Sequence, residues 1–375
     1  MAIKRFTFDS ILTRSFIQFG YDLYRGDANW IPFLRKDMET QLSQAFSFFQ
    51  KEGNAHQHFL ASSNGRIVGR ISAMVNRELR NKDGSPVGTI GFFECIEDYA
   101  VVKDLFDAAL SWLRGERRMT RVWGPMNFDI WHGYRLMTRG FETKIFYGEP
   151  YNKRYYPPFF ETYGFSVKQH WDTVEVTGTE AIENIIMRCK GMYQQFVNRG
   201  YRFEPFNLHR FHGELKKLYR VLRQSFSHFL GMTTIPFAEF EELFSLSKYA
   251  LHSKLFAFVY DETNTLVGFA GSFLELSDAV RLMQGNKGLI AFVNFLTARR
   301  RVNRVIFHMG GMIPDGAEDR AGLGRAGFYY IMRNILNEGY EKVIVALMAS
   351  GNPVHGLLGR NIQPQRQYTL YEITL

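Results

Sequence analysis

The chain has 375 residues, of which 46% are hydrophobic and 16% aromatic, and its formal net charge is +9. This composition excludes a disordered chain, because disordered sequences lack the apolar and aromatic residues that build a core. Two cysteines, Cys95 and Cys189, are too few for a disulfide framework or a cysteine metal site, so we expect two small buried hydrophobic side chains.

The positive charge favours acidic partners such as nucleic acid, anionic lipid, CoA phosphates or an acyl carrier protein. Basic and acidic residues are dispersed, however, and the densest basic runs, 114–121 and 299–304, are predicted to be solvated helix ends rather than a nucleic-acid-binding surface. The N-terminus lacks the apolar core of a secretory signal, and no apolar stretch reaches the roughly 20 residues of a membrane span. We therefore expect a soluble cytoplasmic protein.

The first half alternates between strand-like and helix-like patterns. Its predicted elements are a strand at 3–8, a helix at 11–24, strands at 58–63, 66–75 and 88–94, a helix at 100–113 and a strand at 121–127. Asn64-Gly65 lies between two alternating runs, and both residues tolerate positive φ, so a tight hairpin is predicted there.

The second half repeats this order. Its predicted elements are a strand at 201–206, a helix at 210–226, strands at 254–260, 266–274 and 304–311, a helix at 323–338 and a strand at 342–352. The spacing supports a duplication, since Phe6 precedes Gly69 by 63 residues and Phe203 precedes Gly268 by 65. The second half also carries an insertion of helical character, mainly between Leu276 and Arg301.

A helix with one apolar face is predicted between the two halves, over Thr179 to Arg199. We therefore expect a first domain at 1–178, a connecting helix at 179–200 and a second domain at 201–375. The order β–α–β–β–β–α–β, used twice, indicates an α/β fold with a mixed sheet in each domain.

This order resembles the GNAT acyltransferase superfamily over nearly the whole chain. The sharpest local match is the segment 319–324. The family's signature there is Gln or Arg, two free positions, Gly, one free position, and Gly or Ala. Gly322 and Gly324 match the last two fixed positions, whereas Asp319 stands where Gln or Arg is usual.

The resemblance implies an acyl-CoA site in the second domain. Glycines let a ligand approach the backbone, and the free N–H groups at a helix N-terminus attract phosphate. The CoA pyrophosphate is thus expected at Gly322, Leu323 and Gly324, with charge-assisted contacts from Arg320 and Arg325. The structural alternative is a glycine-rich loop that only begins a helix.

The first domain lacks this motif. Residues 95–99 contain no glycine and two acids, which would repel pyrophosphate but suit a helix N-terminus, so we expect that this copy has lost CoA binding. Tyr163-Gly164-Phe165 resembles the segment that closes many GNAT domains. The stretch 124–134 is rich in aromatic residues and contains a His; it would line a ligand cleft or form a packed Ω-loop.

The resemblance also implies how an acyl group would be transferred. Backbone N–H groups at Gly310, Gly311 and Met312 would polarise the thioester carbonyl, and His308 on the same strand is the candidate base. A strand histidine is otherwise a structural residue.

Three further residues are candidates. The family often has a Tyr acid after the last strand, but Pro353 to Gly359 contains none; His355 would replace it, or the thiolate would leave unassisted. Asn352 would cap a helix or contact CoA. Glu94, at a strand end in the first domain, would be a base there or a surface carboxylate.

The leading hypothesis is a cytoplasmic N-acyltransferase that uses acetyl-CoA, a longer acyl-CoA or an acyl carrier protein, and a small-molecule amine acceptor. No histidine or carboxylate spacing indicates a metal. A Fem-type transferase that uses aminoacyl-tRNA is a second hypothesis, favoured by the positive charge. A non-catalytic pair of domains that binds a metabolite is a third, favoured by Asp319 and the missing Tyr.

Overall fold

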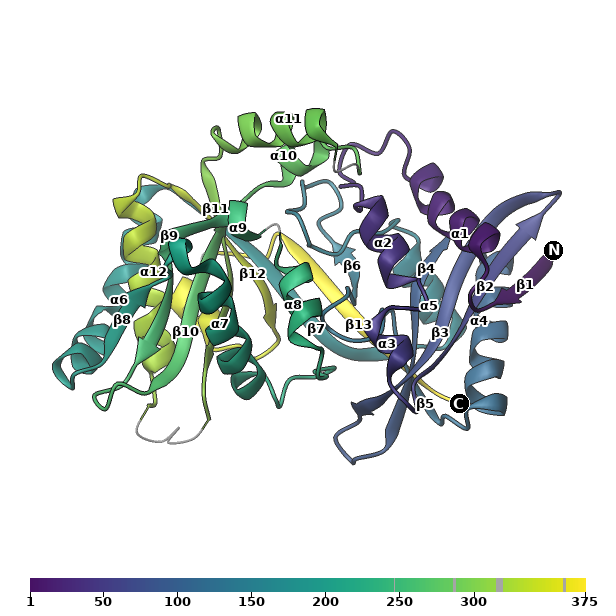
Figure 1. Cartoon of the computed structure of the whole chain (residues 1–375), viewed down its shortest axis with the longest axis horizontal. Helices are drawn as coiled ribbons and strands as arrows, with labels where there is room; N and C mark the ends of the chain where they lie inside the picture. The colour runs from purple at the N-terminus through teal and green to yellow at the C-terminus, as the bar shows by residue number, and fades with distance from the viewer. Residues whose placement is uncertain (246, 286–287, 315–319, 360–361) are drawn as a thin grey trace.

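The computed structural model describes residues 1–245, 247–285, 288–314, 320–359 and 362–375. Two halves, each with helices on both faces of a sheet, lie side by side in Figure 1, and one mixed sheet runs through both. The expectation of an α/β fold with a mixed sheet is confirmed.

The first half supplies seven strands and five α-helices among the described residues. The strands are β1 (Ala2–Phe6), β2 (Ala55–Ser63), β3 (Arg66–Arg80), β4 (Pro86–Cys95), β5 (Arg121–Gly124), β6 (Leu136–Arg139) and β7 (Ser166–Thr177). The helices are α1 (Ser10–Leu23), α2 (Arg35–Gln41), α3 (Ser47–Gln50), α4 (Tyr99–Ser111) and α5 (Tyr156–Tyr163). Helix α6 (Thr179–Asn198) then leads into the second half.

The second half repeats the order with an insertion. The strands are β8 (Arg202–Pro205), β9 (Leu251–Tyr260), β10 (Leu266–Leu274), β11 (Arg304–Met312), β12 (Lys342–Ala349) and β13 (Arg366–Thr374). The helices are α7 (Phe211–Ser225), α8 (Phe237–Leu243), α9 (Ser247–Ala250), α10 (Ser277–Arg281), α11 (Leu289–Arg299), α12 (Leu323–Asn337) and α13 (Val354–Leu358).

Local sequence signals explain several element boundaries. The Asp9 carboxylate accepts hydrogen bonds from the amides of Ile11 and Leu12 at 2.9 Å and so caps α1. Asn64 and Gly65 have φ values of 49° and 75°, which confirms the predicted hairpin. Helix α5 ends at Gly164, whose φ of 111° is a left-handed conformation that glycine adopts without strain.

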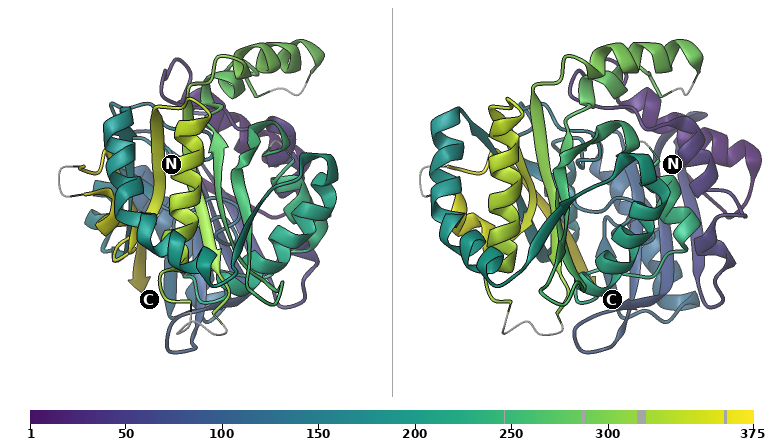
Figure 2. Two further views of the ribbon diagram at one scale, coloured as in Figure 1. Left: turned by 90° about the vertical axis from the view of Figure 1, so that its left-hand side faces the viewer. Right: turned by 60° about the vertical axis from the view of Figure 1, so that its left-hand side comes forward.

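Alternation along the strands decides which helices cover which face. In β9, Phe256 and Phe258 pack toward α7 and α8, whereas Leu255, Ala257 and Val259 face the side covered by α12 and α6. Figure 2 shows these two helix layers on opposite sides of the sheet.

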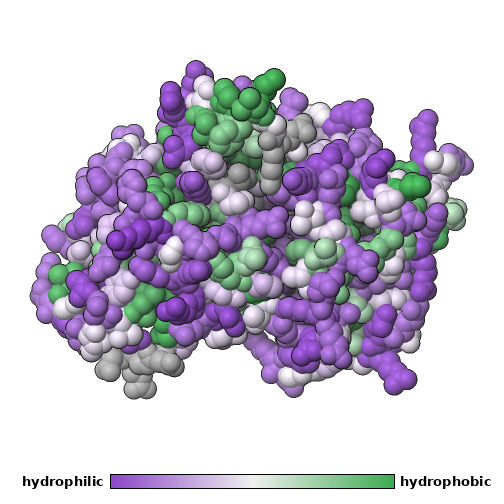
Figure 3. Space-filling view, in the orientation of Figure 1, coloured by the Kyte–Doolittle hydropathy of each residue, from purple (hydrophilic) through white to green (hydrophobic). Residues whose placement is uncertain are grey.

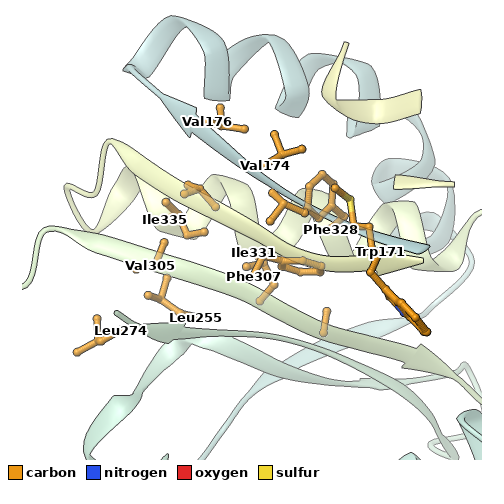
Figure 4. Packing of buried hydrophobic residues seen from close by; sticks show 14 of the residues in the cluster. Trp171, Val174, Val176, Leu255, Leu274, Val305, Phe307, Phe328, Ile331 and Ile335 are labelled. Carbon is orange, nitrogen blue, oxygen red and sulfur yellow. The ribbon is translucent and has the colours of Figure 1, made fainter. Parts of the chain in front are cut away.

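Helix α12 contributes many buried side chains to the core of the second half. Phe328, Ile331 and Ile335 of this helix are fully buried against the sheet, as Figure 4 shows, and the Phe328 ring packs edge-on against Phe307 of β11, with 4.8 Å between ring centroids. Each such side chain contributes about 1.5–3 kcal/mol of burial free energy.

The halves exchange their last strands. The sheet order is β1-β2-β3-β4-β5-β13-β7-β12-β11-β10-β9-β8, with β6 paired to β13. Strand β13, from the end of the chain, therefore lies between β5 and β7 of the first half, and β7 pairs with β12 of the second half. The two exchanged strands pair with each other antiparallel at the centre.

A buried ion pair fixes the exchanged strand β13. The Arg366 Nε lies 2.9 Å from the Glu149 carboxylate, and both side chains are almost completely buried. Arg366 also donates a hydrogen bond of 3.0 Å to the carbonyl oxygen of Lys144. The C-terminal strand is thus bound by side chains as well as by the sheet.

We predict that neither half folds alone, although the expected domain boundary falls on α6. A fragment of residues 1–178 lacks β13, so the facing edges of β5 and β7 lose their shared partner and expose backbone groups that the intact chain pairs. Circular dichroism and urea unfolding of the fragments 1–178 and 179–375 should show no cooperative transition, whereas the co-expressed fragments, which together include α6, should restore one. A stable, monomeric, cooperatively unfolding single fragment would contradict this prediction.

Candidate functional site

Strands β11 and β12 diverge in the second half, so the end of β11 has no parallel partner. They pair in parallel only from Arg304 to Phe307, opposite Lys342 to Val345. The register between β10 and β11 shifts so that His308 is a bulge residue without a partner on β10. Beyond the bulge, His308 and Gly310 are exposed, and Met309, Gly311 and Met312 are partly exposed. This end of β11 is therefore accessible to solvent.

The corresponding place in the first half is closed. Strand β4 carries an equivalent bulge, and β4 and β5 pair only at Gly88 and Thr89, yet the last residues of β4 are all buried. The side-chain oxygen of Asn127 accepts a 2.6 Å hydrogen bond from the amide of Phe92. The hydroxyls of Tyr155 and Tyr156 engage the backbone of Cys95, each at 2.8 Å. These contacts occupy backbone groups that a pantetheine chain would need.

One of the two acidic residues after β4, Asp98, caps the N-terminus of α4. The Asp98 side chain accepts a hydrogen bond from the Ala100 amide at 2.9 Å and caps α4. A carboxylate therefore occupies the helix N-terminus at which the first half would have to bind pyrophosphate. This arrangement supports the expectation that the first copy does not bind CoA.

The two glycines at the start of α12 differ in what the fold requires of them. Gly322 has a φ of 90°, which favours glycine, and a Cβ there would lie 2.7 Å from the sulfur of Met192, whose flexible side chain would have to move. Gly324 has ordinary φ, and a Cβ there would meet no atom within 4 Å. Because packing does not require glycine at 324, the free space beside the first turn of α12 is available to a ligand.

The two arginines near the start of α12, Arg320 and Arg325, differ in their surroundings. The Arg320 guanidinium lies 3.4 Å from the Asp261 carboxylate, in the turn between β9 and β10. Arg325 is exposed on the first turn of α12, beside Leu323, which is buried. Asp319, the departure from the family signature, lies outside the described residues.

His308 points from β11 toward loops of the first half. Its ring lies 6.0 Å from the ring of Phe146, centroid to centroid. Surrounding protein lowers the pKa of His308 to about 4, and the charge of Arg135 acts in the same direction, although solvent still reaches the ring and limits this shift. At neutral pH the imidazole is uncharged and has a lone pair that accepts a proton.

Asn352 and His355 lie after β12. The Asn352 side chain accepts a 2.9 Å hydrogen bond from the Val354 amide, which is a capping contact at the start of α13. The His355 ring is partly exposed, and its Nε2 lies 3.9 Å from the Asp172 carboxylate of β7. The exchanged strand thus supplies a carboxylate next to a candidate acid of the second half.

Glu94 is far from the exposed end of β11. Four strands separate β4 from β11, so at about 4.8 Å per step the two strands are roughly 24 Å apart. Glu94 is buried, and its carboxylate accepts hydrogen bonds from the hydroxyls of Tyr24 (2.9 Å) and Tyr156 (2.7 Å), with Arg70 4.0 Å away. Burial raises its pKa, and Arg70 opposes this shift. The alternative of a surface carboxylate is therefore wrong.

A cavity of about 320 Å³ lies between the halves. Most of its lining is apolar and comes from the first half, and α8 of the second half closes one side. Lining residues include Trp30, Leu34, Met38, Glu94, Arg135 and Glu239. The stretch 124–134 contributes Pro125, Asn127 and His132, so it lines a cleft, and it is also packed, since Met126 and Phe128 are fully buried. Both predicted alternatives for this stretch therefore hold.

The sequence analysis did not pair His132 with any carboxylate, although the structure gives it two. Its Nδ1 lies 2.7 Å from the Asp129 carboxylate and its Nε2 lies 3.0 Å from Glu239 of α8. Burial disfavours the imidazolium, but the two carboxylates outweigh it and raise the pKa of His132 to about 9. Asp129 is close in sequence and was a visible partner, whereas Glu239 comes from the other half.

Two structural findings bear on ligands and membranes. Within the ranges that the structure describes, no three His, Cys or carboxylate side chains are grouped so that they would hold a metal ion. None of the helices in those ranges has both the length and the apolar character for crossing a bilayer.

The paired halves, their diverging strands and the whole-chain superposition on a known structure define a tandem GNAT fold. A tandem GNAT protein from the clavulanic acid biosynthesis pathway superposes with a TM-score of 0.52 and 10% identity, and the match covers 100% of this chain and 98% of that one. No model of a protein family matches the sequence. The predicted pair of GNAT folds is thus confirmed by the structure.

Two curated proteins are similar in sequence. Protein YghO of Escherichia coli is 27% identical over 236 residues, which are 61% of this chain and 56% of that protein. A bacterial ceramide synthase of Caulobacter vibrioides is 28% identical over 243 residues, 64% of this chain and 62% of that protein. The match therefore spans less than two thirds of either relative.

We predict that His132 makes stability fall in alkaline solution. Its pKa is raised above the ordinary 6.5, so its contribution is complete below pH 6.5 and is lost as the pH rises through about 9. The free energy of unfolding should fall by about 3 kcal/mol over this range, a loss that His132→Gln should abolish. Urea unfolding at pH 6.5, 8 and 9.5 measures this, with the exposed His209→Gln as the matched control. An unchanged slope in His132→Gln would refute the assignment.

Proposed function

We propose that the chain is an N-acyltransferase that binds an acyl-CoA in the second half and transfers the acyl group to an amine. The observation that carries this proposal is the accessible β11 backbone beside the first turn of α12, where Gly324 leaves space that the fold itself does not need. Amides of a first helical turn lack intrahelical acceptors and favour phosphate.

The exposed end of β11 supports a direct transfer of the acyl group from CoA to the amine. A backbone N–H at Gly310 or Met312 would donate to the thioester oxygen, where negative charge develops, whereas the N–H of Gly311 points toward β10. The amine nitrogen attacks the carbonyl carbon, the new C–N bond forms, and the C–S bond breaks to release CoA thiolate. The neutral His308 imidazole accepts the proton that the amine loses. The thiolate takes a proton from His355 or from solvent.

A long-chain amine is the acceptor that we favour. A ceramide is the amide of a fatty acid and a long-chain amino alcohol, so the Caulobacter relative's name describes a product of this bond type. In this chain, the apolar cavity would hold such a chain, and Arg135 both lines that cavity and influences the charge of His308. We extend the proposal to a long acyl-CoA donor, with acyl carrier protein as the alternative carrier of the same thioester.

The cytoplasm is the compartment that we propose. Cys95 and Cys189 are both free and buried, and free thiols persist in a reducing compartment.

Gly324→Glu should abolish acyl-CoA binding and leave the fold intact. The new side chain has room, and a carboxylate in a first helical turn suits the helix dipole, but it would repel pyrophosphate. For the wild type, acyl-CoA at about 100 times its dissociation constant should add about 2.7 kcal/mol of stability. Thermal unfolding with acetyl-CoA and palmitoyl-CoA measures this gain and its dependence on chain length. Pantetheine, which lacks the phosphates of CoA, tests whether the gain requires them.

The matched control is Gly213→Glu, because Gly213 is an exposed glycine in the first turn of α7 and also has free space around it. This variant should keep the full stabilisation by acyl-CoA. If neither variant changes the stabilisation, the ligand binds elsewhere. If no CoA thioester stabilises the wild type, the proposal fails, and aminoacyl-tRNA, carrier protein or a purely binding role becomes the better hypothesis.

His308→Gln should lower kcat at least about a hundredfold while the stabilisation by acyl-CoA is unchanged, because a general base contributes to the chemical step and not to donor binding. Amide formation from palmitoyl-CoA and sphinganine, followed by mass spectrometry, measures the rate, and a short amine such as ethanolamine tests the need for a long chain. A variant with the wild-type rate would show that His308 is a structural residue.

A further inference from the structure

The insertion between β10 and β11 carries an apolar surface that no described part of the chain covers. On α11, Leu289 and Ile290 are 80% and 79% exposed, and Val293 and Leu296 continue the same face at helical spacing. Leu282, at the end of α10, is also exposed. We call these five residues the insertion face. Figure 3 shows hydrophobic side chains gathered there, at the top of the molecule.

The opposite side of α11 is anchored to the protein. Phe295 is fully buried and packs edge-on against Tyr249, at 5.8 Å between ring centroids. Phe292 packs against the same Tyr249 ring at 5.3 Å. The helix is therefore apolar on both sides, although only one side meets the protein. A helix in water normally turns a polar face outward, so an apolar outer face of this size indicates a binding surface.

The segment that carries the insertion face is basic after Asp278. No acidic residue occurs in the sequence between Asp278 and Asp315, and Arg299, Arg300 and Arg301 follow directly at the end of α11. Arg300 and Arg301 are exposed. An apolar helix face with basic residues at its end matches the chemistry of an anionic bilayer surface, where side chains reach the acyl region and arginines contact phosphates.

The insertion face also adjoins the cavity. The carbonyl oxygen of Gly285, between α10 and α11, accepts a 3.1 Å hydrogen bond from the amide of Arg35. Arg35 begins α2, next to Phe33 and Leu34, which line the cavity, and Phe33 is itself exposed. Figure 1 shows α10 and α11 over the segment that connects α1 and α2. A surface that met the insertion face would therefore also meet one edge of the cavity.

We propose that the insertion face docks onto the surface of an anionic phospholipid bilayer, with α11 lying in the interface. A second copy of the chain is the less suitable occupant, because a two-fold contact joins the same patch of each copy, and the insertion offers no acidic residue between Asp278 and Asp315 to pair with the arginines. The proposal concerns peripheral docking alone and does not depend on the acyltransferase activity.

Vesicle sedimentation tests the docking with the full chain. The wild type should bind vesicles of phosphatidylglycerol and phosphatidylcholine more strongly than vesicles of phosphatidylcholine alone, and binding should weaken as salt is raised. The double variant Ile290→Asp with Val293→Asp should lower the partition coefficient roughly tenfold or more, because it places charge on the apolar face. Arg300→Gln with Arg301→Gln should reduce the preference for anionic vesicles about tenfold.

The matched control is Ile11→Asp with Met187→Asp, which places the same charges on two exposed apolar residues of α1 and α6. It should bind vesicles as the wild type does, and thermal unfolding without vesicles should show that all variants remain folded. Absence of binding by the wild type at low salt, or equal loss in the control, would overturn the proposal. Analytical ultracentrifugation that shows a dimer abolished by Ile290→Asp with Val293→Asp, without vesicle binding, would assign the face to a second copy instead.

Discussion

The antiparallel pairing of β7 with β13 is the interaction on which the rest of this structure depends. Each strand comes from one half of the chain and lies next to a strand of the other half, so the central sheet exists only when both halves are present. The buried Arg366–Glu149 pair adds a requirement for precise placement, since either charge left alone in the interior would cost several kcal/mol. The order of the strands at the junction follows from this exchange.

The exchange brings side chains from both halves into the same sites. Asp172 reaches His355 because β7 lies beside β12, and His132 meets both Asp129 and Glu239 at the junction. The cavity likewise has walls from α2 of the first half and α8 of the second. A duplicated fold thereby gains binding surfaces that a single copy would not have.

The same backbone irregularity, a bulge, occurs in both copies, but its surroundings differ. Both β4 and β11 carry a bulge next to a parallel partner that diverges. In the first copy, Asn127, Tyr155 and Tyr156 fill the gap and satisfy the backbone, which stabilises the core. In the second copy the gap stays accessible, beside a helix that begins at a glycine. Side chains outside the bulge therefore decide whether this feature is structural or available to a ligand.

The sequence by itself determined the local elements and their repetition. Strand alternation, helical periodicity and the Asn64-Gly65 turn act over a few residues, so they were predictable without a structure, and the repeat indicated the tandem fold. The sequence also placed Asp98 correctly as an acid at a helix start. It could not show that φ favours glycine at 322 but not at 324, because the backbone conformation at the start of α12 depends on the surrounding fold. Only the tertiary structure decided the strand exchange, the burial of Glu94, the Glu239 partner of His132 and the exposure of α11. These depend on contacts between residues far apart in the chain, for which local patterns carry no information.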